Sequence, residues 1–182
     1  MERERVRERE PETGMPDFYE AVYADKAEAR RRAKDGRVVV RGRESGWQQG
    51  RQGLVKYYLT PQTPDIPVDC YFVFVHDIRT HSGMHKHQGG LVIFVLEGEG
   101  YTLLNEQRVD WEKGDLLLLP IVPGGIAHQH FNRVPGSSCK WLAITYDPYQ
   151  YIMGSMFEQK ELSPDWKKLH ADKEAALQQE SA

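Results

Sequence analysis

The hydrophobic positions of this chain fall into short runs rather than into helical stripes. Between Val55 and Tyr146, apolar runs of a few residues follow one another, and the turns between them contain Gly, Pro or Asn. The runs are "VKYYL", "CYFVFVHDI", "LVIFVLEG", "YTLLN", "QRVDW", "DLLLLP", "AHQHF" and "KWLAITY". Many short strands at this spacing, with no helix-length pattern between them, are typical of a β-sandwich or β-barrel. The pattern therefore predicts an all-β domain over residues 55–146.

The segment before this domain has a different pattern, and we treat residues 1–54 as an N-terminal extension with one helix. Its first 15 or so residues alternate Glu and Arg and predict a solvated lead-in. A helix is predicted over Asp17–Asp35, because Asp17 can cap it, Phe18 and Val22 share a face, and Gly36 can end it. The run "RVVV" at 37–40 predicts a first strand, and "GRESGWQQGRQG" at 42–53 predicts a polar loop.

The segment after the domain, residues 147–182, is predicted to be a tail with one helix. Ser163 can cap that helix, Pro164 stands at its first position, and Trp166, Leu169 and Leu177 lie along it. No internal repeat of 20 to 50 residues is visible in the sequence.

Length, charge and composition narrow the class of protein. The 182 residues suit one domain with short terminal additions. The net charge of −3 offers no general attraction to nucleic acid or anionic membranes. No apolar run approaches the roughly 20 residues of a membrane helix, and "MERERVRERE" has no apolar segment typical of a secretory signal. We therefore expect a cytoplasmic protein without nucleic-acid or membrane partners, in which Cys70 and Cys139 are reduced core thiols.

Histidines give the strongest chemical signal. Six of the seven fall between His76 and His130, and two pairs, His85/His87 and His128/His130, are spaced i, i+2. Residues i and i+2 of a strand share a face, so each pair can aim two imidazoles in one direction. Antiparallel folding can bring the pairs together, and imidazole is a ligand for Fe, Zn, Cu and Ni. For His76 and His81, the sequence leaves open a functional role or an ordinary hydrogen-bonded role.

Two longer stretches around these pairs resemble the two motifs of the cupin superfamily. "HKHQGGLVIFVLEGEG" is similar to the first motif, and "GDLLLLPIVPGGIAHQHFN" is similar to the second, with extra residues "VPG" after Pro120. The resemblance implies a jelly-roll β-barrel over residues 55–146 with short N-terminal and C-terminal helices. Because barrels of this superfamily commonly pair, it also implies a homodimer.

The first motif departs from its usual form at a ligand position. Leu91 stands where the motif usually has a glutamate ligand, so the resemblance implies a metal site of His85, His87 and His128. Such a three-histidine set resembles the gentisate/salicylate dioxygenase branch and the diketone-cleaving type. The gentisate branch also has His-x-His in its second motif, which implies that His128 is a ligand and that His130 lies in the active-site shell.

The predicted pocket is apolar. Gentisate-type enzymes place a substrate-binding arginine where this chain has Ile93. Strand parity puts Leu91 and Ile93 on the same side as His87, toward the barrel interior. We also predict that Gln88 and Tyr146 line the pocket. On "KWLAITY" the face that carries Tyr146 is the more apolar one, which predicts that Tyr146 points inward and Trp141 outward.

Three imidazoles on one side of a metal would leave open positions for a small-molecule substrate and O2. Fe(II) is the expected ion, with Mn, Ni, Cu and Zn as alternatives. His130 is the candidate catalytic residue, as the proton acceptor for a substrate hydroxyl. Three functions stay open: an Fe(II) dioxygenase that cleaves a chelating phenolic, catecholic or diketone-type substrate, a lyase or isomerase that uses the metal as a Lewis acid, and a non-enzymatic small-ligand-binding protein.

Overall fold

The computed structural model describes residues 17–88, 90–152 and 157–171 of the chain. These residues belong to two compact units. One contains the residues up to 37 together with 65–67, and the other contains residues 38–64 and those from 68 onward. The predicted lead-in over residues 1–15, Gly89 and Leu177 lie outside the described residues.

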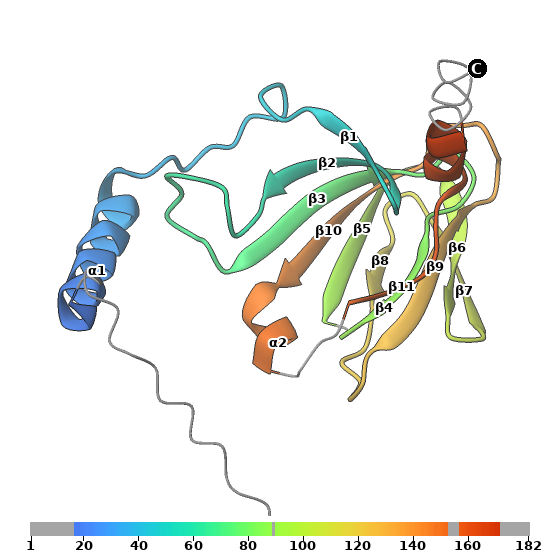
Figure 1. The fold of residues 1–182 in the computed structure, drawn as a ribbon. Coiled ribbons are helices and arrows are strands. Elements are labelled where there is room, and N and C mark those ends of the chain that lie inside the picture. Colours follow the sequence, from blue (N-terminus) through green and yellow to red (C-terminus); the bar gives the residue numbers. More distant parts are fainter. Residues whose placement is uncertain (1–16, 89, 153–156, 172–182) are drawn as a thin grey trace, which may run out of the picture. The chain divides into compact units, whose positions relative to one another are not determined.

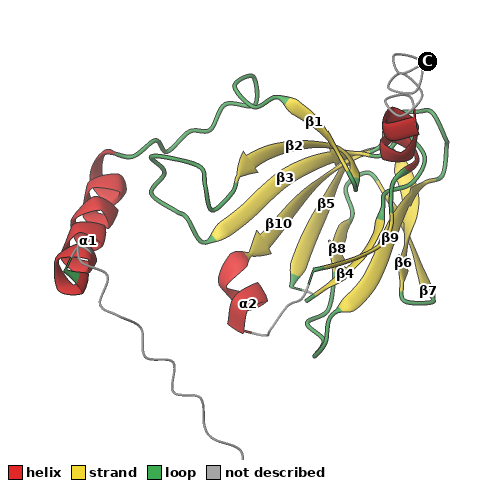
Figure 2. Ribbon diagram, in the orientation of Figure 1, coloured by secondary structure: helices red, strands yellow, loops and turns green. Residues whose placement is uncertain are grey.

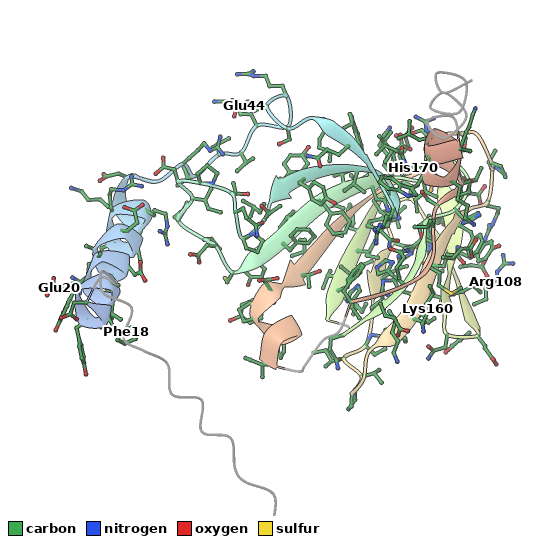
Figure 3. All side chains as sticks on the ribbon, viewed as in Figure 1. Phe18, Glu20, Glu44, Arg108, Lys160 and His170 are labelled. Carbon is green, nitrogen blue, oxygen red and sulfur yellow. The ribbon has the colours of Figure 1, made fainter. Side chains whose placement is uncertain are left out.

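The first unit contains the predicted N-terminal helix, α1 (Phe18–Asp35). The Asp17 side chain caps it by accepting a hydrogen bond from the Tyr19 backbone N–H at 2.8 Å, and the Gly36 N–H donates to the Arg32 carbonyl. The helix is confirmed with both of its predicted ends. None of its residues is buried, and Phe18, labelled in Figure 3, is 75% exposed. Local capping, rather than burial of a hydrophobic face, accounts for its boundaries.

The second unit is an antiparallel β structure of two sheets (Figures 1 and 2). The first sheet has the strand order β1-β2-β3-β10-β5-β8, and the second has the order β11-β4-β9-β6-β7. The strands are β1 (Trp47–Gly50), β2 (Gly53–Leu59), β3 (Tyr71–Asp77), β4 (Met84–His87), β5 (Leu91–Glu97), β6 (Glu99–Leu104), β7 (Gln107–Glu112), β8 (Leu116–Leu118), β9 (Ile126–Asn132), β10 (Lys140–Tyr146) and β11 (Glu158–Glu161). The all-β jelly-roll prediction is confirmed, and each predicted apolar run contributes a strand.

Two predictions before residue 55 are wrong. Residues 37–40 are not a strand, and Val38 and Val39 are exposed, because a β-branched run without a partner strand gains no ladder of hydrogen bonds. The predicted loop over 42–53 instead contains β1, which pairs with β2 from Trp47↔Lys56 to Gly50↔Gly53. The backbone pairing of a hairpin forms this strand despite its polar side chains.

The chain after β10 adds two elements that the sequence pattern did not predict. Helix α2 (Asp147–Ile152) follows β10 directly, and β11 pairs with β4 at the edge of the second sheet. The sheets therefore extend beyond residues 55–146 at both ends. The predicted C-terminal helix is confirmed over residues 164–171, and the Ser163 hydroxyl accepts a hydrogen bond from the Trp166 backbone N–H. Among the described residues, no helix has the length and apolar character needed to cross a membrane.

The core of the β unit confirms the period-2 pattern of β5. Leu91, Ile93 and Val95 are each at most 3% exposed, whereas Phe94 between them is 42% exposed. The inward residues pack in a cluster with Trp111 and Trp141. Arg108 on β7 and Lys160 on β11, both labelled in Figure 3, are exposed at the surface.

Strand β10 has the opposite orientation to the one predicted. Trp141, Ala143 and Thr145 are buried, whereas Tyr146 is 39% exposed and packs against Tyr71. The prediction chose the more apolar face as the inner one. That choice is wrong here because part of the barrel interior is a cavity rather than a filled apolar core. Trp141 and Thr145, on the less apolar face of β10, line this cavity.

Candidate metal centre and its cavity

Three histidines converge between strands β4 and β9. His85 and His87 lie on one face of β4, and His85 is directly opposite His128 in the antiparallel register of β9. The centroid of the His128 ring lies 4.2 Å from that of the His85 ring and 4.8 Å from that of the His87 ring. One ligand atom from each of the three residues lies within 4.8 Å of the others. Strand pairing therefore brings the three predicted ligands close enough together to hold one metal ion.

Hydrogen bonds orient the rings for a ligand role. The backbone carbonyl of Ile126 binds Nδ1 of His128 at 3.1 Å, and the carbonyl of Gln88 binds Nδ1 of His87. In both rings Nδ1 is used in this hydrogen bond, which leaves Nε2 as the nitrogen that can bind a metal. Nε2 of His128 is buried without a partner. Such bonds to the second nitrogen fix the tautomer of metal-binding histidines. An orphaned buried acceptor at the centre of three converging rings fits a divalent ion.

The electrostatic environment keeps these rings in the form that binds metals. Burial, with a smaller contribution from the nearby His87, lowers the pKa of His128 to about 3. Burial also lowers the pKa of His87, and burial together with His128 and His87 holds the pKa of His85 well below its usual value. All three are neutral at pH 7, and a neutral imidazole is the metal-binding form.

The group of potential ligands formed by the described residues contains these three histidines and no carboxylate. Leu91 is 3% exposed and lines the same cavity as the histidines, so an apolar side chain replaces the glutamate at the usual ligand position. The donor set is neutral, and a divalent ion bound here would keep its full positive charge.

Gly125, just before β9, has a structural role beside this site. Its φ is +82°, a left-handed conformation, and a Cβ there would lie 2.7 Å from the backbone carbonyl of His87. Glycine permits both the conformation and the close approach. The loop into β9 therefore rests on the strand that carries two of the ligands.

The histidines face a cavity of about 360 Å³ that both sheets line. Pockets for small ligands have volumes of roughly 300 to 1,000 Å³, so this one suits a molecule of one or two rings. Much of its wall is aromatic, formed by Tyr57, Phe72, Phe74, Trp141 and Phe157. The Phe157 ring stacks on the rings of His85 and His87, with centroid distances of 5.0 and 5.6 Å. Among the described lining residues, none is Lys or Arg, and Asp147 is the one carboxylate.

His130 also lines the cavity, and a hydrogen-bonded chain holds its ring. Nε1 of Trp111 donates to the Thr102 hydroxyl at 2.9 Å, and that hydroxyl lies 2.7 Å from Nδ1 of His130. The Trp111 N–H can only donate, so the buried Thr102 hydroxyl finds an acceptor for its own proton only at Nδ1. This arrangement satisfies all three groups and leaves a proton on Nε2 of His130, which is buried without a partner.

The resting His130 is therefore a neutral hydrogen-bond donor. Burial, with a further contribution from His128, holds its pKa well below the usual range. The sequence pattern had predicted a proton acceptor at this position. The protonated Nε2 favours a different role, in which the ring stabilises negative charge on a substrate oxygen.

The other predicted pocket residues are divided between the cavity and the core. Leu91 lines the cavity, whereas Ile93 and Gln88 are buried but do not line it, and Tyr146 lies outside. Phe72 and Phe74 also line the cavity, together with His76. Phe72, Phe74 and His76 alternate along β3 and therefore share one face, which is the sequence signal that could have placed them on one wall of the cavity. Nδ1 of His81 instead lies within hydrogen-bond distance of the Ser82 carbonyl, at 2.9 Å, and of Nε2 of Gln129, at 3.0 Å.

Comparisons with known proteins agree with this architecture. Residues 73–145 match the model of the cupin domain family. Residues 73–145 are therefore similar to a cupin domain, and the two-sheet β unit has the cupin fold. A search of curated proteins finds no match.

Solved structures show the same fold in proteins of several activities. The polyketide cyclase RemF from Streptomyces resistomycificus is similar, with a TM-score of 0.51, 19% identity, and coverage of 71% of this chain and 89% of that chain. The nucleoside dehydratase Pac13 from Streptomyces has a TM-score of 0.50, 14% identity, and coverage of 70% and 94%. A salicylate 1,2-dioxygenase variant from Pseudoaminobacter salicylatoxidans has a TM-score of 0.46, 21% identity, and coverage of 82% and 39%. At these identities the likeness concerns the fold alone.

Proposed function

We propose that this protein is a metal-dependent enzyme, and specifically an Fe(II) dioxygenase that cleaves a small phenolic, catecholic or diketone-type substrate. The observation that carries the proposal is the convergence of His85, His87 and His128 on one point of an aromatic-walled cavity. When bound there, a divalent metal supplies Lewis acidity, and Fe(II) adds reactivity toward O2.

The neutral donor set supports a substrate with two adjacent oxygen donors. Three imidazoles leave the charge of a divalent ion uncompensated, which favours a chelating anion such as a catecholate or enolate. The aromatic side chains of the wall can pack against a planar ring. His130, two residues from the ligand His128, then donates its Nε2 proton to a substrate oxygen that carries negative charge.

The lining also limits the substrate class. A carboxylate remote from the metal would need a cation, yet no Lys or Arg stands among the described lining residues, and Asp147 would repel it. We therefore propose a substrate with a phenolic or diketone head and no separate carboxylate.

The test is an oxygen-uptake screen with protein that is loaded with Fe(II) under anaerobic conditions. Catechols, phenolic acids and β-diketones are the panel, and mass spectrometry identifies the products. The proposal predicts O2 consumption in proportion to a ring-opened or C–C-cleaved product. Zn(II)-loaded protein and the His128→Ala variant are the controls and should consume none. Absence of uptake across the panel, with Fe(II) bound, would contradict the dioxygenase assignment.

A second candidate is a lyase or cyclase that uses the metal only as a Lewis acid. The observation that favours it is the Nε2–H of His130, since a fixed donor of this kind stabilises an enolate without O2. RemF and Pac13, which share the fold, are named as a cyclase and a dehydratase. Product formation by the Zn(II) form under nitrogen would favour this candidate over the dioxygenase.

A further inference from the structure

A tryptophan and a histidine form a polar pair on the wall of the cavity opposite the metal ligands. Trp141 on β10 and His76 on β3 are directly opposite each other in the register of the first sheet, and their ring centroids are 4.9 Å apart. Both side chains are 2% exposed and line the cavity. The metal ligands belong to β4 and β9 of the second sheet. A molecule in the cavity therefore lies between a metal-binding wall and this pair.

Each member of the pair has a buried nitrogen without a partner. Nε1 of Trp141 and Nε2 of His76 make no hydrogen bond within the described residues. The indole N–H can only donate. The backbone of Gln52 forms a hydrogen bond with the His76 ring, which leaves Nε2 as an acceptor. The pair thus offers one donor and one acceptor.

The chain keeps space free beside the acceptor. Gly53 has a φ of +128°, and a Cβ at this position would lie 2.5 Å from Nε2 of His76. Any other residue would therefore cover the nitrogen and strain the backbone. Oε1 of Gln52, another residue of the cavity lining, is also buried without a partner. Its amide is oriented by donation from Nε2 to Oε1 of Gln159 at 2.9 Å, so Oε1 is a second acceptor.

A buried polar group without a hydrogen-bond partner loses its hydration without compensation, so a buried cluster of such groups suggests a site that a polar ligand fills. We infer that His76 and Trp141 form a second polar subsite that binds a hydroxyl group of the substrate, remote from the oxygen pair at the metal. A hydroxyl suits this subsite because its oxygen accepts from the indole N–H while its proton is donated to Nε2 of His76. A carbonyl would satisfy only the donor, and a carboxylate would face two acceptors without a cation.

This inference rests on the proposed function, because it assumes that the substrate chelates the metal. It narrows the class to polyhydroxylated aromatic compounds, with two adjacent oxygens at one end and a further hydroxyl at the other. The cavity volume of about 360 Å³ suits one or two fused rings of this kind.

The test compares chelators that differ by one hydroxyl. Zn(II)-loaded protein prevents oxidation, and calorimetry under nitrogen measures the dissociation constants. Catechol is compared with 1,2,4-trihydroxybenzene, and 2,3-dihydroxynaphthalene with 2,3,6-trihydroxynaphthalene. We expect at least one trihydroxy compound to bind about tenfold more tightly than its parent, the scale of one net hydrogen bond. Equal affinity within both pairs would overturn the subsite and leave it as a place for water only.

Variants then assign the gain to the pair. Trp141→Phe removes the indole N–H, and His76→Phe removes the acceptor, and in each the tenfold gain should vanish while the parent chelators still bind. Gly53→Ala provides an independent test, since it covers Nε2 without altering either polar side chain. A gain that persists in Trp141→Phe and His76→Phe would refute the inference. If the parents fail to bind metal-loaded wild-type protein, the proposed chelation itself is wrong, which is a separate result.

Discussion

His76 is expected to make the metal-free protein sensitive to acid. Its side chain is 2% exposed, and burial lowers its pKa to about 3. An unfolded chain returns the imidazole to a pKa of about 6.5, so between the two values the unfolded state binds a proton that the folded state does not. The contribution of His76 to the free energy of unfolding is therefore fully present above a pH of about 6.5, the pKa in the unfolded chain, and decreases as the pH falls below that value.

The size of the effect follows from the same two values. At pH 5 the unfolded state gains about 2 kcal/mol from protonation of a histidine with a pKa of 6.5. The folded state gains almost nothing, because its pKa of about 3 lies well below pH 5. The free energy of unfolding should therefore fall by about 2 kcal/mol between pH 8 and pH 5 through His76 alone.

Urea unfolding of metal-free protein at pH 8 and pH 5, with a chelator present, measures this effect. The loss of stability between the two pH values should be about 2 kcal/mol smaller in His76→Gln than in the wild type. Contributions from other histidines and from carboxylates occur in both proteins and cancel in the difference. His170→Gln, which alters a partly exposed histidine, is the matched control and should keep the wild-type loss. If His76→Gln and the wild type lose the same free energy, His76 is not held neutral by burial.

Other predictions concern the metal and the assembly. His128→Ala should lose the bound metal, whereas His130→Ala should keep it and lower turnover by about 10²-fold, as metal analysis and kinetics would show; an empty site in His130→Ala would reverse the two assignments. Gly125→Ala should weaken metal binding more than Gly124→Ala, because both have positive φ but only the Gly125 Cβ would clash, with the His87 backbone; equal affinities would exclude the clash as a cause. Light scattering should give the mass of a homodimer, and a monomer mass at micromolar concentrations would contradict that expectation.

Strand positions and the shared face of His85 and His87 could be predicted from the sequence because both follow from alternation. Apolar runs bounded by turn residues marked the strands, and the spacing of His85 and His87 placed two rings on one face. The pairing of His85 with His128 needed long-range register, which the sequence pattern does not contain. The resemblance to cupin motifs supplied that information.

Strands that form through backbone pairing alone could not be predicted from the pattern of hydrophobic residues. Strands β1 and β11 are polar and join the sheets through hydrogen bonds to β2 and β4, so no hydrophobic period marks them. The orientation of β10 was missed for a different reason. Placing the more apolar face inside assumes a filled core, but in this barrel the side of β10 that carries Trp141 and Thr145 borders a cavity.

That reversed orientation bears directly on the proposed chemistry. Had β10 turned Tyr146 inward, the wall opposite the metal would carry a phenol; instead it carries the indole N–H of Trp141 beside Nε2 of His76. Leu91, on β5 next to β10 in the same sheet, lines the cavity and contributes no charge. Positive charge would therefore be concentrated at the metal, while His76 and Trp141 on the far wall carry no charge and select by hydrogen bonding. Such a cavity should prefer a neutral hydroxyl over a carboxylate at the distal end of its substrate, because a carboxylate would lose its hydration without gaining a cation.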